Sequence, residues 1–155
     1  MSHWVHEGKK IEEIPEGVVG FVYKITNKST GKMYVGRKNV KRRVKTKVKT
    51  KNKNAKNATK SKVAIKSSDW ASYIGSNKTL ITEITSYGKD EFTFEILGFL
   101  FTQGQLNYVE ENIQHFLNVT LSENYYNDSI GSRRYINIVK DDRLLDTIKQ
   151  IRNKC

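Results

Sequence analysis

The chain has 155 residues, with one cysteine and one proline. The cysteine, Cys155, is the last residue, which excludes an internal disulfide and a zinc site built from several cysteines. So little cysteine fits a reducing compartment, and we expect a cytoplasmic protein.

Long apolar runs are also missing. No run approaches the roughly 18 residues that a membrane span needs, and the N-terminus, with His3, His6 and Glu7, lacks the apolar segment of a signal peptide. We therefore expect one soluble domain that has no membrane partner and stays in the compartment where it is made. His3 and His6 lack a third ligand at suitable spacing, so we expect no metal site there.

Acidic residues are absent from residues 37 to 66, where 14 cations gather. They are Arg37, Lys38, Lys41, Arg42, Arg43, Lys45, Lys47, Lys49, Lys51, Lys53, Lys56, Lys60, Lys62 and Lys66. The rest of the chain holds 14 cations and 16 acids, so this segment accounts for the net charge of +12. Such a distribution is typical of a polyanion binder. Nucleic acid is favoured over a membrane surface, because the segment lacks the aromatic and leucine face of an interfacial helix.

Within the basic segment, lysine alternates with valine, threonine and asparagine, as in a strand. Like charges at every second position would share one face and repel, which argues against a strand. Two interpretations remain: a short helix from about Asn39 leads into a mobile basic loop, or the segment becomes ordered only against phosphate. In both, each cation that meets a phosphate adds salt-sensitive affinity without sequence preference.

Residues 20 to 36 contain two strand-forming runs joined by a turn, and each run carries a tyrosine, Tyr23 or Tyr34. Side chains alternate along a strand, so the length of the turn decides whether the tyrosines share a face. A four-residue turn with Thr26 opposite Gly31 places them directly opposite each other. A five-residue turn places them on opposite faces.

The rest of the chain, after the basic segment, predicts three helices and one strand. Apolar residues from Leu80 to Tyr87 predict a helix that ends at Gly88. Residues 91 to 98 predict a third, central strand, and a helix is predicted over about 140–153, after a basic spot at Arg133 and Arg134. The expected fold class is α/β: a small antiparallel three-stranded sheet with flanking helices, preceded by an extended lead-in.

A helix with two adjacent glutamates is predicted from a one-sided apolar stripe. The stripe consists of Leu106, Val109, Ile113, Phe116 and Leu117. At about 100° per residue, Glu110 falls at the border of the stripe and Glu111 nearly opposite it. We expect Glu110 to be held rigidly while still reaching a ligand, and Glu111 to be solvated. By itself, Glu110 would be interpreted as a boundary residue that pairs with a lysine.

The hairpin resembles the GIY-YIG nuclease family. Gly20-Phe21-Val22-Tyr23 stands for the first motif and Tyr34-Val35-Gly36 for the second, and the tyrosines are 11 positions apart. The same order of elements continues over about residues 18–130, with residues 41–66 as a basic insertion. The stretches YVGRKN, SDWASYIGS and NYVEENIQ are similar to a group of viral and phage proteins classed as endonucleases. The triplet Tyr73-Ile74-Gly75 lies 50 positions after Tyr23, too far away to be its hairpin partner.

This resemblance implies a metal-dependent DNA endonuclease, in which Glu110 ligates Mg²⁺ or Mn²⁺ and no small-molecule cofactor takes part. Tyr23 would assist deprotonation of the attacking water, and Tyr34 would position water or phosphate. A tyrosine has a reference pKa of about 10, so adjacent cations or metal would have to lower the pKa of Tyr23. Asn127 would support the geometry of the site. The candidates for the cation that faces the phosphate are Arg37, Lys38, Arg42 and Arg43.

Further DNA contacts are implied for the insertion and for the segment after it: Arg42, Lys45, Lys47, Lys49, Lys51, Lys53, Tyr73 and Ser76. A packing role for Tyr73 has equal weight. A monomer is favoured, in the cytoplasm of the host cell if the protein is viral. The alternatives are a nucleic-acid-binding protein on the same scaffold that does not cut, and an RNA-associated structural protein.

Overall fold

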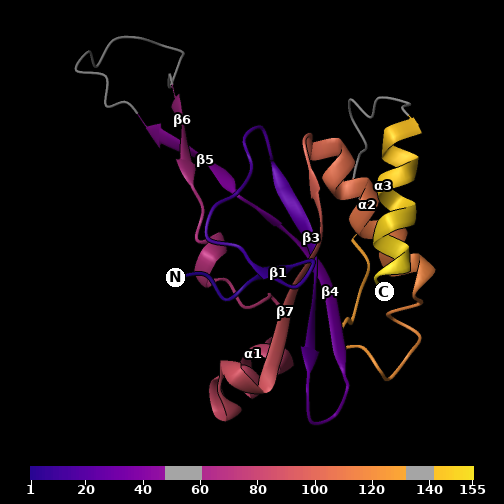
Figure 1. Ribbon diagram of the computed structural model, residues 1–155. Helices are drawn as coiled ribbons and strands as arrows, with labels where there is room; N and C mark the ends of the chain where they lie inside the picture. The colour runs from indigo at the N-terminus through magenta and orange to yellow at the C-terminus, as the bar shows by residue number, and fades with distance from the viewer. Residues whose placement is uncertain (48–60, 132–141) are drawn as a thin grey trace.

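The computed structural model describes residues 1–47, 61–131 and 142–155. Its elements in chain order are β1 (Val5–His6), β2 (Lys9–Lys10), β3 (Gly20–Asn27), β4 (Met33–Asn39), β5 (Lys41–Lys47), β6 (Ser61–Ser67), the 3-10 turn η1 (Trp70–Ser72), α1 (Lys78–Tyr87), the 3-10 turn η2 (Lys89–Glu91), β7 (Phe92–Leu100), α2 (Gln103–Phe116) and α3 (Asp142–Asn153) (Figure 1). Outside the described residues lie Lys49, Lys51, Lys53, Arg133 and Arg134. Within the described ranges, no helix is long and apolar enough to cross a bilayer.

The central sheet has five strands in the order β2-β1-β7-β3-β4. Strands β7, β3 and β4 form the expected antiparallel trio, and β7 is central as predicted. The prediction of only three strands is wrong, because the lead-in also joins the sheet. Val5 pairs in parallel with Glu95 of β7, and the fully buried Trp4 packs edge-to-face on Phe21 and Phe94. This aromatic anchor fixes the lead-in against β7.

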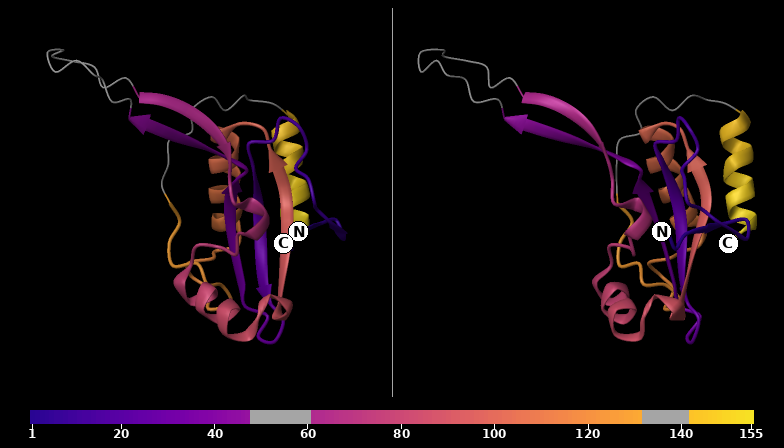
Figure 2. Two further views of the ribbon diagram at one scale, coloured as in Figure 1. Left: turned by 90° about the vertical axis from the view of Figure 1, so that its left-hand side faces the viewer. Right: turned by 60° about the vertical axis from the view of Figure 1, so that its left-hand side comes forward.

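Different elements cover the two faces of the sheet (Figure 2). On one face, Tyr23 and Ile25 of β3 belong to a core that includes Leu80 of α1. On the other face, Val22 of β3 and Val35 of β4 belong to a core with α2 and α3. Strand β3 is therefore buried on both faces, which explains its nearly continuous apolar sequence.

The two tyrosines of the β3–β4 hairpin lie on the same face, as a four-residue turn predicts. Tyr34 lies opposite Ile25, two positions along the strand from Tyr23. The centroids of the two tyrosine rings are 6.1 Å apart. The prediction that the tyrosines lie directly opposite each other is wrong, because the residue opposite Tyr23 is Gly36.

The turn has four residues but starts one position later than predicted. Asn27 N–H donates to Lys32 O at 2.9 Å, and the four residues between them form the turn. The Asn27 Oδ1 atom also accepts hydrogen bonds from the N–H groups two and three residues ahead, at 3.0 and 3.3 Å. An asparagine that organises its own turn in this way moves the register by two residues but keeps the parity, so Thr26 does not face Gly31.

The basic insertion begins and ends in a two-stranded antiparallel ribbon of β5 and β6. The predicted short helix is wrong, and so, within the described residues, is the prediction of order only against phosphate. The argument from charge repulsion fails because the register places most cations opposite neutral side chains, with Arg42 opposite Lys66 as the exception. Arg43 lies opposite Ile65, and Lys45 lies opposite Val63.

Helix α2 carries two buried stripes. The predicted apolar stripe faces the core, except that Phe116 is half-exposed. The second stripe has the same helical spacing and is polar, with Asn107, Glu111 and Gln114 all buried. The prediction that Glu111 is solvated is therefore wrong, since its exposed fraction is 7%. An apolar pattern detects only the first stripe.

The remaining helix predictions are confirmed. Helix α1 ends at Gly88, whose φ of 93° is a conformation that favours glycine. Its N-terminus is capped by Asn77, which accepts a hydrogen bond from Leu80 N–H at 3.0 Å. Helix α3 occupies the predicted C-terminal range, and its Leu144, Ile148 and Ile151 contribute to the core.

Candidate active site

A pocket of about 430 Å³ lies at β4, the edge strand of the sheet. It is lined by Tyr34, Glu110 and Asn127, and by the predicted DNA contact Ser76. Residues that are far apart in the sequence therefore meet in one place. The pocket is also lined by Asn77, Lys78, Gln114, Asp128, Ser129 and Gly131.

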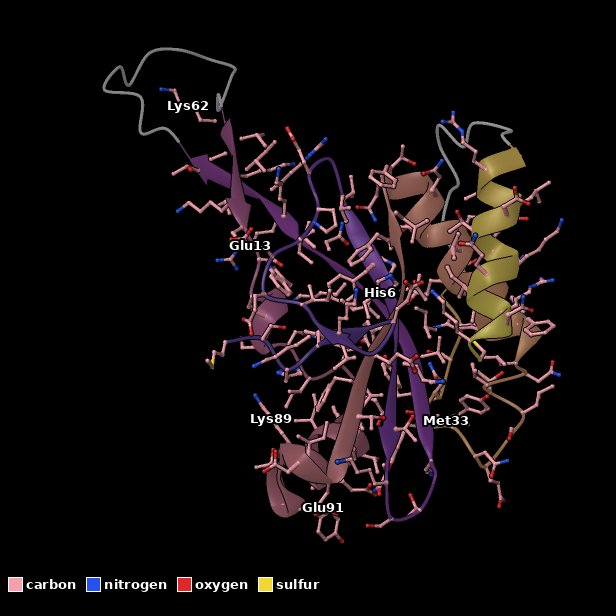
Figure 3. The ribbon with its side chains drawn as sticks, in the orientation of Figure 1. His6, Glu13, Met33, Lys62, Lys89 and Glu91 are labelled. Carbon is pink, nitrogen blue, oxygen red and sulfur yellow. The ribbon has the colours of Figure 1, made fainter. Side chains whose placement is uncertain are left out.

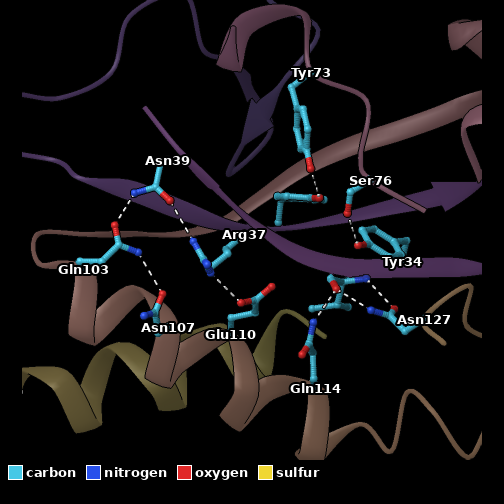
Figure 4. Close-up of polar contacts among 12 residues, drawn as sticks. Tyr34, Arg37, Asn39, Tyr73, Ser76, Gln103, Asn107, Glu110, Gln114 and Asn127 are labelled. Carbon is cyan, nitrogen blue, oxygen red and sulfur yellow. Dashed lines mark hydrogen bonds and ion pairs between the residues drawn. The ribbon is translucent and has the colours of Figure 1, made fainter. Parts of the chain in front are cut away.

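The pocket extends around the edge of β4 and takes residues from both faces of the sheet. Tyr34 lies on the face that carries α1, whereas Glu110 comes from α2 on the opposite face (Figure 4). Tyr34 and Glu110 meet because, among the described residues, no strand of the sheet lies on the outer side of β4. The edge of the sheet, and not one of its faces, thus forms the floor of the pocket.

Glu110 starts a chain of polar contacts along α2 and β4. Arg37 Nε lies 2.8 Å from Glu110 Oε2, and both side chains are mostly buried, with exposures of 14% and 18%. Arg37 Nη1 also donates to Asn39 Oδ1 at 2.8 Å, and Asn39 Nδ2 donates to Gln103 Oε1. Gln103 Nε2 then donates to Asn107 Oδ1 at 2.9 Å (Figure 4). Both ends of the Arg37 guanidinium group are held, so the position of its charge is fixed.

Asn127 holds the outer edge of β4. Its Oδ1 accepts from Val35 N–H at 3.1 Å, and its Nδ2 donates to Val35 O at 2.8 Å. Gln114 Nε2 donates to the same carbonyl oxygen at 3.0 Å. The amide of Asn127 therefore takes the place of a neighbouring strand, which satisfies backbone groups that an edge strand leaves open.

Tyr23 lies behind the pocket and does not line it. It is 1% exposed, and its hydroxyl donates a long hydrogen bond of 3.5 Å to the Tyr73 hydroxyl. Burial raises the pKa of Tyr23 well above its ordinary value, and the nearby Tyr73, Tyr34 and Glu110 raise it further. The described residues therefore do not supply the lowering of pKa that a base at Tyr23 needs.

Tyr34 is the tyrosine that lines the pocket. Its hydroxyl lies 2.9 Å from Ser76 Oγ. Burial raises the pKa of Tyr34, the hydrogen bond with Ser76 lowers it, and the charge of Glu110 raises it. Near neutral pH both tyrosines are therefore uncharged phenols, which act as hydrogen-bond donors and acceptors.

Lys38 lies on the tyrosine face, away from Arg37. Its Nζ atom is 2.6 Å from Asp69 Oδ1 and 3.9 Å from the centroid of the Tyr73 ring. The contact with Lys38 lowers the pKa of Asp69. Tyr73 thus packs between Tyr23 and Lys38, which favours the packing role that its sequence position left open.

The other candidate cations lie on the ribbon. Arg42, Arg43 and Lys45 belong to β5, where their side chains are exposed, and none of them lines the pocket. Lys47 ends β5. Of the four candidates for the phosphate-facing cation, Arg37 is the one that contacts Glu110.

The donors around Glu110 fit the magnesium ion that the resemblance implies. Glu110 and Asp128 are the carboxylates that line the pocket. In the described ranges, no group of three or more His, Cys, Asp or Glu residues is arranged to hold a metal. Mg²⁺ commonly binds through one or two carboxylates and several waters, whereas structural zinc needs a full set of protein ligands. Glu110, with Asp128 as a second carboxylate in the lining of the pocket, matches the first arrangement.

Sequence reasoning missed Gln103, Asn107 and Gln114, which contact the site from α2. Together with Glu110 they recur at spacings of four, three and four, which places all of them on one face of the helix. This polar stripe was visible in the sequence as amide side chains on either side of Glu110. A search restricted to apolar periodicity does not detect it.

Comparison with known proteins matches the chain to a family model. The family model described as "Putative endonuclease segE, GIY-YIG domain" matches residues 4–137. The match covers most of the chain, including the hairpin, the ribbon, Glu110 and Asn127. Neither the curated proteins nor the solved structures give a match.

Proposed function

Since the chain belongs to the GIY-YIG nuclease family, we propose that it is a metal-dependent endonuclease that hydrolyses phosphodiester bonds of DNA. One observation carries this proposal: the pocket at the edge of β4 brings Tyr34, Glu110 and Asn127 together, with Arg37 bound to Glu110. Tyr34 belongs to the second motif and Arg37 directly follows it, whereas Glu110 comes from α2 and Asn127 from the segment after α2. Packing alone does not require a hydroxyl, a carboxylate and a guanidinium group at one open edge.

Hydrolysis of a phosphodiester needs an activated water, positive charge beside the phosphorane and assistance to the leaving oxygen. Bound magnesium would supply positive charge beside the phosphate and lower the pKa of a water. Glu110 would hold the ion through its carboxylate. Arg37, fixed by Glu110 and Asn39, would place a guanidinium group next to the phosphate oxygens.

The two tyrosines take different roles in this proposal. Tyr34 would hold a water or a phosphate oxygen through its hydroxyl, because it lines the pocket. Tyr23 would support Tyr34 from behind, since it is buried and its pKa is raised. Asn127 would position Tyr34 and Arg37 indirectly, through its two hydrogen bonds to Val35 between them.

The ribbon of β5 and β6 supplies the second part of the proposal, which is affinity for DNA. Its described strands carry exposed cations, namely Lys41, Arg42, Arg43, Lys45, Lys62 and Lys66. No acidic residue occurs between Arg37 and Lys66. Cations on an extended ribbon would contact phosphates without sequence preference, and binding would weaken with salt.

The alternative function is DNA binding without cleavage on the same scaffold. The two functions separate when plasmid DNA is incubated with the protein in Mg²⁺ and, in parallel, in EDTA. Nicking or cutting is expected only in Mg²⁺ and only with the wild type, while Glu110→Ala binds the same plasmid nearly as tightly. Absence of cleavage by the wild type in Mg²⁺ and in Mn²⁺, with binding intact, would establish the alternative.

A further inference from the structure

The β5–β6 ribbon extends away from the domain. Figures 1 and 2 show it leaving the sheet beyond β4, and Figure 3 shows Lys62 far from the helices. In the described part of the chain, only the residues at its base lie close to other elements: Lys41, Ile65, Lys66 and Ser67 line a second pocket, of about 380 Å³, with the lead-in and Trp70. A two-stranded ribbon without a covering layer is only marginally stable in water. Side chains beyond its base are exposed to solvent and available to a partner, and Ile65, which lines the pocket at the base, is still 68% exposed.

The two faces of the ribbon differ in chemistry. The first face carries Val63 and Ile65, which are 52% and 68% exposed, directly opposite Lys45 and Arg43. We call this the apolar face. Directly opposed side chains on such a ribbon are about 5 Å apart. The apolar face thus combines two adjacent aliphatic groups with two cations beside them.

The opposite face has smaller or less exposed apolar groups. Val44 lies opposite Ala64 there and is partly buried. Arg42 lies opposite Lys66 on the same face, and Thr46 lies opposite Lys62. The cationic side chains on this face are long enough to keep their aliphatic stems on the ribbon while their charged ends lie in solvent.

We infer that the ribbon docks in the major groove of duplex DNA through the apolar face, with Val63 and Ile65 against the base edges and cations of both faces on the phosphates. The inference rests on the proposed DNA substrate and adds the surface and groove that are used. Paired strands are about 4.8 Å apart, so with side chains the ribbon matches a groove about 12 Å wide and not one about 6 Å wide. Thymine methyl groups on the floor of the major groove are suitable contacts for aliphatic side chains. The uniformly positive charge of the ribbon complements the phosphate walls.

The test uses the full-length protein, a mixed-sequence DNA duplex, and heparin as a polyanion without grooves, all in EDTA so that no cleavage interferes. The test variant is Val63→Thr/Ile65→Thr, which keeps the charge and the β-branching. Its matched control on the opposite face is Val44→Thr/Ala64→Ser. Affinities are measured over a range of salt concentrations.

The test variant is expected to bind the duplex about tenfold more weakly, because apolar burial is lost, with an unchanged salt slope and unchanged heparin binding. The control variant is expected to bind like the wild type. Unchanged duplex affinity of the test variant, or equal weakening on heparin and duplex, would overturn the inference. Thermal unfolding of both variants checks that the domain stays folded.

Competition identifies the groove independently of any variant. Methyl green, which occupies the major groove, is expected to displace the wild-type protein, whereas netropsin, which occupies the minor groove, is expected to leave it bound. Displacement by netropsin alone would contradict the assignment. Duplex RNA, whose major groove is narrow and deep, is expected to bind more weakly than DNA, and equal or tighter binding of RNA would overturn the inference. Because these assays need no catalysis, their outcome is independent of whether Glu110 supports cleavage.

Discussion

Gly36 lies directly opposite Tyr23 in the β3–β4 hairpin, and a β-carbon at Gly36 would stand 2.7 Å from the Tyr23 hydroxyl oxygen. The same β-carbon would lie 3.1 Å from Cε1 of Tyr34. Gly36 of the second motif therefore makes room for Tyr23 of the first motif and for the ring of Tyr34 in its own motif. The two motifs depend on each other sterically.

Substitution Gly36→Ala is expected to destabilise the fold by about 1–3 kcal/mol, because a buried tyrosine ring has to move. Denaturation in urea measures the change. Tyr23→Phe removes the hydroxyl that the new methyl group meets first, so it is expected to cost less stability in the Gly36→Ala background than in the wild type. Additive effects of the two substitutions would show that the contact is not the cause.

Substitution Asn127→Ala is expected to lower stability by about 1–3 kcal/mol, because Val35 N–H loses its buried partner. Cleavage is expected to fall as well, since β4 carries both Tyr34 and Arg37. Asn124→Ala, at an exposed side chain of the same segment, serves as the control and is expected to leave both properties unchanged. Equal stability of the Asn127 and Asn124 variants in urea would contradict the role of Asn127 as a clamp.

The pKa of Tyr23 predicts a pH dependence of stability. Burial raises the pKa of the folded state above the value of about 10 for an unfolded tyrosine. As pH rises, the unfolded chain therefore releases this proton before the folded chain does. The contribution of neutral Tyr23 to stability is fully present below a pH of about 10 and is lost as pH rises through the raised pKa of the folded state. Urea unfolding at pH 8 and above pH 10 is expected to show a smaller loss for Tyr23→Phe than for the wild type. An equal loss would mean that Tyr23 ionises as easily in the folded chain as in the unfolded one.

Arg37 and Arg43 are expected to respond differently to a change that keeps the charge. Arg37→Lys replaces the rigid pair of N–H donors that contact Glu110 and Asn39 by a single rotating ammonium group, so single-turnover cleavage is expected to fall roughly 10²-fold. Arg43→Lys, on the exposed ribbon, is expected to cleave like the wild type. A larger loss of cleavage for Arg43→Lys than for Arg37→Lys would mean that the cation facing the phosphate lies on the ribbon.

The sequence predicts the hairpin and its two tyrosines, but it leaves open whether the tyrosines share a face, because that depends on the length of the turn. It does not predict the register, because Asn27 reorganises the turn through its own side chain. The ribbon was predicted wrongly for a different reason. Repulsion between lysines on one strand decides nothing until the residues across the pair are known, and here Arg43 and Lys45 face Ile65 and Val63.

The sequence proposes the residues of the candidate site but does not predict their arrangement. The position of Glu110 at the border of the apolar stripe matches its exposure of 18%. Its approach around the edge of β4, opposite the tyrosine face, depends on which strand is left unpaired. Burial of Glu111 likewise depends on the tertiary packing of the polar stripe that it forms with Asn107 and Gln114. Such features arise from long-range contacts, which a periodic pattern does not encode.

Cleavage by Glu110→Gln tests the central claim most directly, because the substitution removes the charge and keeps the size of the side chain. The control is Glu123→Gln, which removes the same charge from an exposed position outside the pocket. In Mg²⁺, single-turnover cleavage by Glu110→Gln is expected to fall by about 10²-fold or more, while its DNA affinity in EDTA and the activity of Glu123→Gln stay at the wild-type level. Cleavage by Glu110→Gln at the wild-type rate would contradict a catalytic centre at the edge of β4.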